Sequence, residues 1–260
     1  SNEVPIVYED LAHSESEENN AVDLMLQTGS SFELGFEGLA IQELIASMGY
    51  NSAFNQLRTK EQLGYIVAAV VKKSTGGGNG VHVIVQSSST LPPVLEERCL
   101  RWVEQFRKEL EEMPPSRFAM EAAAVRANIL EKDIKLAEEV SSIWGEILAT
   151  MSHSEHFKNP DFDRIEKFAN VLTLNNEEGD EKSTSSIKSA AELKTKVLEF
   201  YDNYFMPDSP NRRAVSSRVY NRKAKALYEE NIGKPGYITS YDDARKLKQM
   251  LTAFPTAPYW

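Results

Sequence analysis

The sequence predicts an α+β fold, a mixed or antiparallel sheet with helices packed mainly on one face. Residues 21–28 and 81–85 place β-branched or leucine side chains at every second position, as half-buried strands do. Residues 32–48 and 95–110 repeat apolar side chains at helical spacing. The elements follow in the order strand, helix, hairpin, several helices and a last strand at 214–220, which is the order expected of an α+β domain.

The first helix has sequence signals at both of its ends. Ser30 and Ser31 are expected N-caps because their hydroxyls can accept hydrogen bonds from free backbone N–H groups. Gly49 is expected to end this helix, and a second, short helix is expected from Ser52 to about Gln62.

A hairpin is expected after the short helix. Gly64 breaks the helical pattern, and residues 65–71 are apolar and β-branched, which predicts a central strand. The glycine-rich segment 75–80 is typical of a turn between two strands, and 81–85 is the returning strand.

The second half of the chain is predicted to be mainly helical. Pro92 and Pro93 open a long helix whose apolar residues form one stripe, and Pro114 and Pro115 end it. The stripe consists of Leu95, Cys99, Trp102, Phe106 and Leu110. Further helices are expected within 117–151, at 161–172, at 190–205 and at 241–251, and an exposed loop at 175–189.

The chain is interpreted as one domain that follows an acidic arm. Residues 1–20 contain six acidic residues and no Lys or Arg, so this stretch is expected to be a linker or a loosely held arm. Residues 21–260 are interpreted as a single α+β domain.

Composition excludes several classes of function. The 260 residues are 41% hydrophobic and 26% charged, which is typical of a globular protein. The net charge of −10 argues against a nucleic-acid partner, and no apolar run reaches membrane-spanning length. Cys99 is the only cysteine, so we expect no disulfide and no cysteine-rich zinc module. This cysteine usage, and an acidic start unlike a signal peptide, lead us to expect a cytoplasmic protein.

The histidines do not form a zinc-peptidase motif. His153 and His156 lie one residue short of the H-x-x-E-H spacing, and Asn159-Pro160 follows them, so they are interpreted as a solvated helix end. His82 alternates with core valines, and His13 lies in the acidic arm. No metal ligand is therefore assigned, and the residues alone show no complete catalytic centre.

A basic cluster surrounds the last predicted strand, within residues 212–225. It is interpreted either as a solvated face or as a site for an anionic ligand or an acidic partner. Its members are Arg212, Arg213, Arg218, Arg222, Lys223 and Lys225.

Residues 54–67, FNQLRTKEQLGYIV, closely resemble a segment of the insulysin and pitrilysin family of zinc metallopeptidases. Residues 143–147, 198–201 and 237–249 are similar to other segments of that family. The resemblance maps to the last of four homologous domains and implies an insulinase-type, LuxS/metallopeptidase-like α+β fold. In this family the first domain carries H-x-x-E-H and the zinc, and the two halves close around a chamber.

The resemblance also implies roles for individual residues. Arg58 and Tyr65 match the family's substrate-gripping arginine and tyrosine, and Phe54 matches an apolar residue beside the cleavage point. Tyr65 is expected to contact the peptide carbonyl that is attacked at the zinc, and a donor there stabilises charge in the transition state. Gly64 matches the glycine before the tyrosine.

The chain is therefore expected to be the substrate-binding, C-terminal portion of an insulysin-like zinc metalloendopeptidase, inactive alone because zinc is bound by an absent N-terminal half. The implied partners are that half and peptide substrates, and a homodimer is a further option. The alternative is a non-catalytic binding or assembly module, or a separately encoded half. A third interpretation is an unrelated α+β domain that binds an acidic ligand through the basic cluster.

Overall fold

The computed structural model describes residues 5–73, 78–151, 164–174, 187–234 and 236–250. It contains a six-stranded mixed sheet, with the strand order β3-β4-β2-β5-β1-β6. Neighbours from β3 to β5 are antiparallel, and β1 is parallel to both β5 and β6. The strands are β1 (Ile6–Leu11), β2 (Asn20–Ser30), β3 (Ile66–Lys73), β4 (Gly78–Ser87), β5 (Arg213–Tyr220) and β6 (Tyr237–Ile238).

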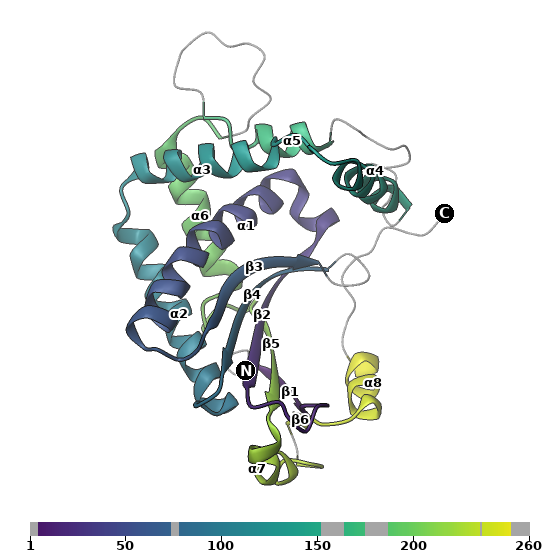
Figure 1. Ribbon diagram of the computed structural model, residues 1–260. Helices are drawn as coiled ribbons and strands as arrows, with labels where there is room; N and C mark the ends of the chain where they lie inside the picture. The colour runs from purple at the N-terminus through teal and green to yellow at the C-terminus, as the bar shows by residue number, and fades with distance from the viewer. Residues whose placement is uncertain (1–4, 74–77, 152–163, 175–186, 235, 251–260) are drawn as a thin grey trace.

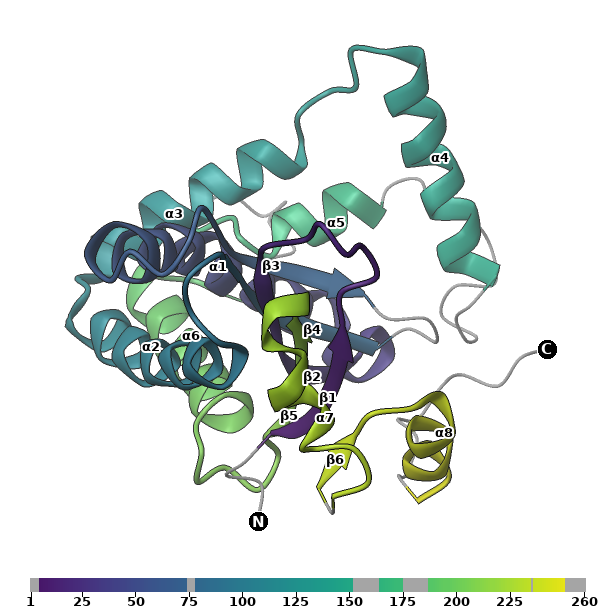
Figure 2. The ribbon, with the colours of Figure 1, turned by 60° about the horizontal axis from the view of Figure 1, so that its bottom comes forward.

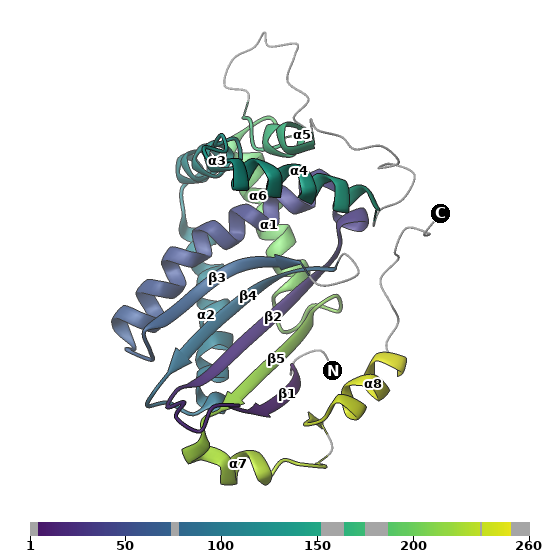
Figure 3. The same cartoon turned by 45° about the vertical axis from the view of Figure 1, so that its right-hand side comes forward.

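Helices cover one face of this sheet, which confirms the predicted fold class. α1 (Ser31–Ala53), α2 (Pro92–Glu112) and α6 (Ala190–Tyr204) pack against the strands, and α3 (Pro115–Ile129) and α5 (Arg164–Asn170) lie on α1 (Figures 1 and 3). The other helices are η1 (Phe54–Lys60), α4 (Leu136–Met151), η3 (Arg222–Ala224), α7 (Lys225–Glu229) and α8 (Tyr241–Met250).

The core lies between the sheet and these helices. Val22, Leu24 and Leu26 of β2 are fully buried, and the predicted α2 stripe from Leu95 to Leu110 is buried throughout. On the opposite sheet face, residues such as Met25 are only half-buried. The helical layer therefore supplies the core, and one face of the sheet stays accessible.

The prediction of an acidic arm at 1–20 is wrong for residues 6–11, which form β1 between β5 and β6. Val7 is buried, and Glu9 is fully buried. Glu9 accepts hydrogen bonds from Arg218 Nη1 at 3.0 Å and from the Tyr220 hydroxyl at 2.8 Å. Partners more than 200 positions away therefore hold this acidic segment in the sheet, and local composition cannot show them.

Two further predictions, the end of the first helix at Gly49 and the central position of the strand after Gly64, are wrong. Ser30 does cap α1, where its hydroxyl and Glu33 form a reciprocal capping box. Gly49, however, does not end this helix; an added Cβ there would lie 3.3 Å from Phe106 and 3.4 Å from Trp102, so Gly49 permits close packing on α2. The strand predicted to be central is β3. In the structure β3 lies at the edge of the described sheet, and α1 packs against it.

Two peripheral segments complete the description. Of the predicted loop at 175–189, residues 175–186 lie outside the described residues, and Ile187 is fully buried. α4 extends away from α3 and exposes Leu136, Val140 and Trp144 (Figure 2). Within the described ranges, no helix combines the length and the apolar character needed to cross a bilayer.

Candidate functional site

The candidate site begins where α1 continues into the π-helix η1. The Glu61 N–H donates to the Gln56 carbonyl at 3.0 Å, and the Leu63 N–H donates to the Leu57 carbonyl at 3.0 Å. Leu57 is fully buried and anchors this wider turn on the core. Isolated π turns are frequent at functional sites because they displace side chains from regular helical positions.

A tight connection then positions Tyr65 directly before β3. Gln62 has a φ of 54°, so the chain reverses direction at this non-glycine residue. Gly64 instead allows the backbone to pass close to β4, because a Cβ on Gly64 would lie 1.8 Å from the Gln86 carbonyl oxygen. The sequence suggested a change of direction at Gly64, and the structure places that change two residues earlier.

Arg58 lies between two aromatic rings. Its guanidinium carbon is 4.6 Å from the centre of the Phe54 ring and 4.4 Å from the centre of the Tyr65 ring. Tyr65 is 79% exposed, so this stack is on the surface. Each such cation–π contact contributes about 0.5–1 kcal/mol at an exposed position.

The guanidinium of Arg58 has no carboxylate partner among the described residues. Both rings lie close to the guanidinium carbon, and guanidinium N–H groups can donate to an oxygen of a ligand. The structure thus brings together the three residues that the sequence nominated, Phe54, Arg58 and Tyr65. Their roles toward a substrate stay predictions.

Tyr50 extends the stack and was not nominated from the sequence. Its ring lies 6.5 Å from the Phe54 ring, centre to centre, with 24° between the planes, and Tyr50 is 43% exposed. The sequence does contain a pattern that indicates Tyr50: Tyr50, Phe54 and Arg58 follow one another at four-residue intervals, so they share one side of the helix.

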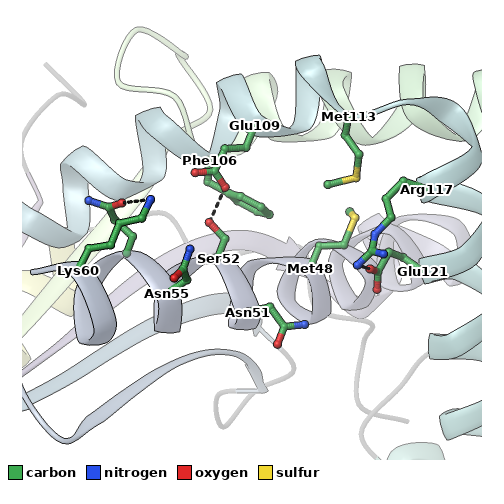
Figure 4. Close-up of a pocket in the computed structure, with 11 residues that line it drawn as sticks. Met48, Asn51, Ser52, Asn55, Lys60, Phe106, Glu109, Met113, Arg117 and Glu121 are labelled. Carbon is green, nitrogen blue, oxygen red and sulfur yellow. Dashed lines mark hydrogen bonds and ion pairs between the residues drawn. The ribbon is translucent and has the colours of Figure 1, made fainter. Parts of the chain in front are cut away.

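A separate cavity of about 250 Å³ is lined by the end of α1, by η1, by α2 and by the start of α3 (Figure 4). Met48 and Met113 face one another across it. The Ser52 hydroxyl donates to Glu109 at 2.6 Å and accepts from Trp102 Nε1 at 3.0 Å. These polar groups already bind one another, so the cavity is a weaker candidate for a ligand than the exposed stack.

Comparisons with known proteins show which proteins this chain is similar to. Residues 44–144 match a family model described as PQQ synthase PqqF-like, C-terminal lobe domain 4. The chain is 30% identical over 242 residues to insulin-degrading enzyme of Drosophila melanogaster, covering 92% of this chain and 21% of the relative. It is 32% identical over 181 residues to the enzyme of Bos taurus, covering 70% of this chain and 15% of that one.

The fold is also that of a solved structure. The crystal structure of pitrilysin matches with a TM-score of 0.68 at 22% identity, over 98% of this chain and 23% of that chain. This chain is a homologue of the insulysin and pitrilysin peptidases. It spans about a fifth of the length of the curated relatives that it matches.

Among the residues that the structure describes, the other chemistry-bearing side chains of this insulysin homologue do not form a second centre. His82 Nδ1 lies 2.7 Å from Asp23, which also pairs with Lys72 at 3.0 Å. Cys99 is buried, and burial raises the pKa of its thiol. His153 and His156 lie outside the described residues. Within the described part, no three His, Cys, Asp or Glu residues gather as a metal site would require.

The basic cluster is not one surface. Arg218 is buried and pairs with Glu96 at 2.8 Å and with Glu9 at 3.0 Å. Lys223 pairs with Glu18 at the surface, and Arg222 donates to the His13 carbonyl at 3.1 Å. Interpreting the whole cluster as a solvated face or an anion site is therefore wrong for Arg218, because its charge is neutralised inside the protein.

Proposed function

We propose that this insulysin homologue is the C-terminal, substrate-binding portion of a zinc metallopeptidase. The observation that supports the proposal is the Arg58 guanidinium, which contacts Phe54 and Tyr65 on an accessible surface and has no carboxylate partner in the part of the chain that the structure describes. Such a donor set suits the carbonyl oxygens of an extended peptide. The homology to proteins named insulin-degrading enzyme favours a peptide as the ligand.

Each of the three residues has a distinct task in this proposal. The edge of Arg58 donates to a backbone carbonyl of the substrate and orients the peptide. The Tyr65 hydroxyl donates to the carbonyl oxygen that gains negative charge during cleavage. Phe54 supplies an apolar wall for a side chain near the cleaved bond.

The described residues do not fit a zinc site, because no group of three ligand side chains converges there. We therefore assign no zinc ligand and no water-activating residue to them. In the proposed enzyme, the N-terminal half supplies the metal and this chain supplies substrate contacts. The chain alone is accordingly expected to bind peptides without cleaving them.

The decisive experiment compares Tyr65→Phe and Arg58→Ala in the assembled peptidase. Tyr65→Phe should lower kcat by a factor on the order of 10 to 1,000, as for the loss of one charge-stabilising donor. Arg58→Ala should mainly raise KM, because its contact is present before and during cleavage. Unchanged kcat in Tyr65→Phe together with unchanged KM in Arg58→Ala would refute the proposal.

A non-catalytic binding or assembly module is the second candidate. The same stack could hold a partner's peptide segment without cleavage. The lack of three converging metal-ligand side chains among the described residues favours this view. To distinguish the two functions, the N-terminal half of the peptidase is added to this chain, and peptide binding and hydrolysis are measured. Recovered peptide hydrolysis supports the peptidase, whereas binding without hydrolysis supports the module.

A further inference from the structure

We propose that Tyr50 and Phe54 form a second subsite on the peptide-binding surface, which takes an aromatic or long aliphatic side chain of the bound peptide. The inference rests on the proposed function, since it assumes that a peptide lies along Arg58 and Tyr65. It adds a residue and a side-chain preference that the resemblance to insulysins did not supply.

The geometry makes one row of planar groups. Tyr50 follows Phe54 at 6.5 Å, and Arg58 lies 4.6 Å from Phe54 and 4.4 Å from Tyr65. Because Tyr50 and Arg58 lie four residues on either side of Phe54, the row continues past Phe54 on the side away from Arg58. Tyr50 is 43% exposed and Tyr65 is 79% exposed, so a ligand can reach both ends of the row.

The repeat distance suits an extended peptide. Such a peptide rises about 3.3 Å per residue, so side chains on one side recur about every 6.6 Å. If a peptide carbonyl is bound by Arg58, a side chain farther along on the same side lies against Phe54 and Tyr50. The near-parallel rings, 24° apart, would offer that side chain flat apolar surfaces.

Packing gives Tyr50 no other evident task. The core beneath this side of the helix is closed by Ala53 and Leu57, both fully buried. The Tyr50 hydroxyl has no hydrogen-bond partner among the described residues. The positive charge of Arg58 also disfavours a Lys or Arg side chain of the peptide in this subsite. The subsite is therefore expected to prefer apolar side chains.

The test measures peptide binding to the 260-residue chain by fluorescence anisotropy. The probes are labelled Ser- and Gln-rich nonapeptides that carry one Phe, Leu, Ala or Lys at successive positions. Phe or Leu at one position should tighten binding about 3- to 10-fold over Ala, as expected for one aromatic contact. Tyr50→Ala should abolish this gain, and Tyr50→Phe should retain it.

Tyr241→Ala is the matched control, because Tyr241 is an equally polar ring, 82% exposed, on the distant helix α8. Its peptide preference should match that of the unmodified chain. If Tyr50→Ala weakens every peptide equally or none, while Arg58→Ala still weakens them all, the subsite is refuted and the proposed function stands. If Arg58→Ala leaves all affinities unchanged, both fail together.

Discussion

Arg58 shows how a single side chain can be prepared for binding. A free arginine has many rotamers, and fixing them on binding costs free energy. Here Phe54 and Tyr65 restrict the guanidinium before any ligand arrives. Part of the ordering cost is therefore already met in the free protein, so binding a carbonyl requires less further ordering.

Gly64 provides the residue-scale prediction. A Cβ at position 64 would meet the Gln86 carbonyl oxygen at 1.8 Å, and a backbone atom cannot move aside as a flexible side chain can. Gly64→Ala should therefore lower the free energy of unfolding by about 3 kcal/mol or more, measured by urea denaturation. It should also displace Tyr65 and weaken peptide binding.

Gly233→Ala is the control for this substitution. Gly233 has a φ of 75° but no heavy atom within 4 Å of an added Cβ. Gly233→Ala should lower the free energy of unfolding by only about 1 kcal/mol, because of backbone strain. Equal losses in the two variants would show that the contact with Gln86 does not restrict position 64.

At the scale of elements, an ion cluster joins three strands on the accessible sheet face. Asp23 of β2 bonds to His82 of β4 at 2.7 Å and to Lys72 of β3 at 3.0 Å. Burial alone would raise the pKa of Asp23, but these two partners outweigh it and hold that pKa below its usual value. Folding therefore favours the ionised carboxylate.

The linkage of this pKa to folding gives a pH prediction. Because the folded pKa is lowered, the stabilisation is present above the unfolded pKa of about 3.9 and is lost as the pH falls through the folded value. Asp23→Asn should lower the free energy of unfolding by about 1 kcal/mol at pH 7 and by progressively less below pH 4. Urea unfolding at a series of pH values measures this, and a pH-independent difference would contradict it.

On the scale of the whole molecule, Arg218 connects the two ends of the sequence through the core. Its guanidinium on β5 binds Glu9 of β1 and Glu96 of α2. Arg218→Ala would leave two carboxylates buried without their cation. It should therefore lower the free energy of unfolding by about 3–5 kcal/mol.

Lys223→Ala is the control, because its exposed pair with Glu18 should contribute at most about 1 kcal/mol to the free energy of unfolding. Similar urea midpoints for the two variants would contradict the structural role of Arg218.

Some of this organisation follows from local patterns, and some does not. The α2 stripe and the capping of α1 by Ser30 were predictable, because burial periodicity and caps depend on neighbours within a few residues. β1 was not, because Glu9 finds its partners at the far end of the chain. The row from Tyr50 to Tyr65 was only partly predictable, because it crosses from a helix to a strand.

The sequence by itself determined the fold class, the apolar stripes and the segment 54–67 that carries the resemblance to insulysins, since each is encoded in spacing along the chain. Tertiary structure alone decided that β3 lies at an edge, that Arg218 is internal and that Arg58 is sandwiched by two rings. The physical reason is that strand order, charge neutralisation and ring stacking depend on contacts between residues that the fold brings together.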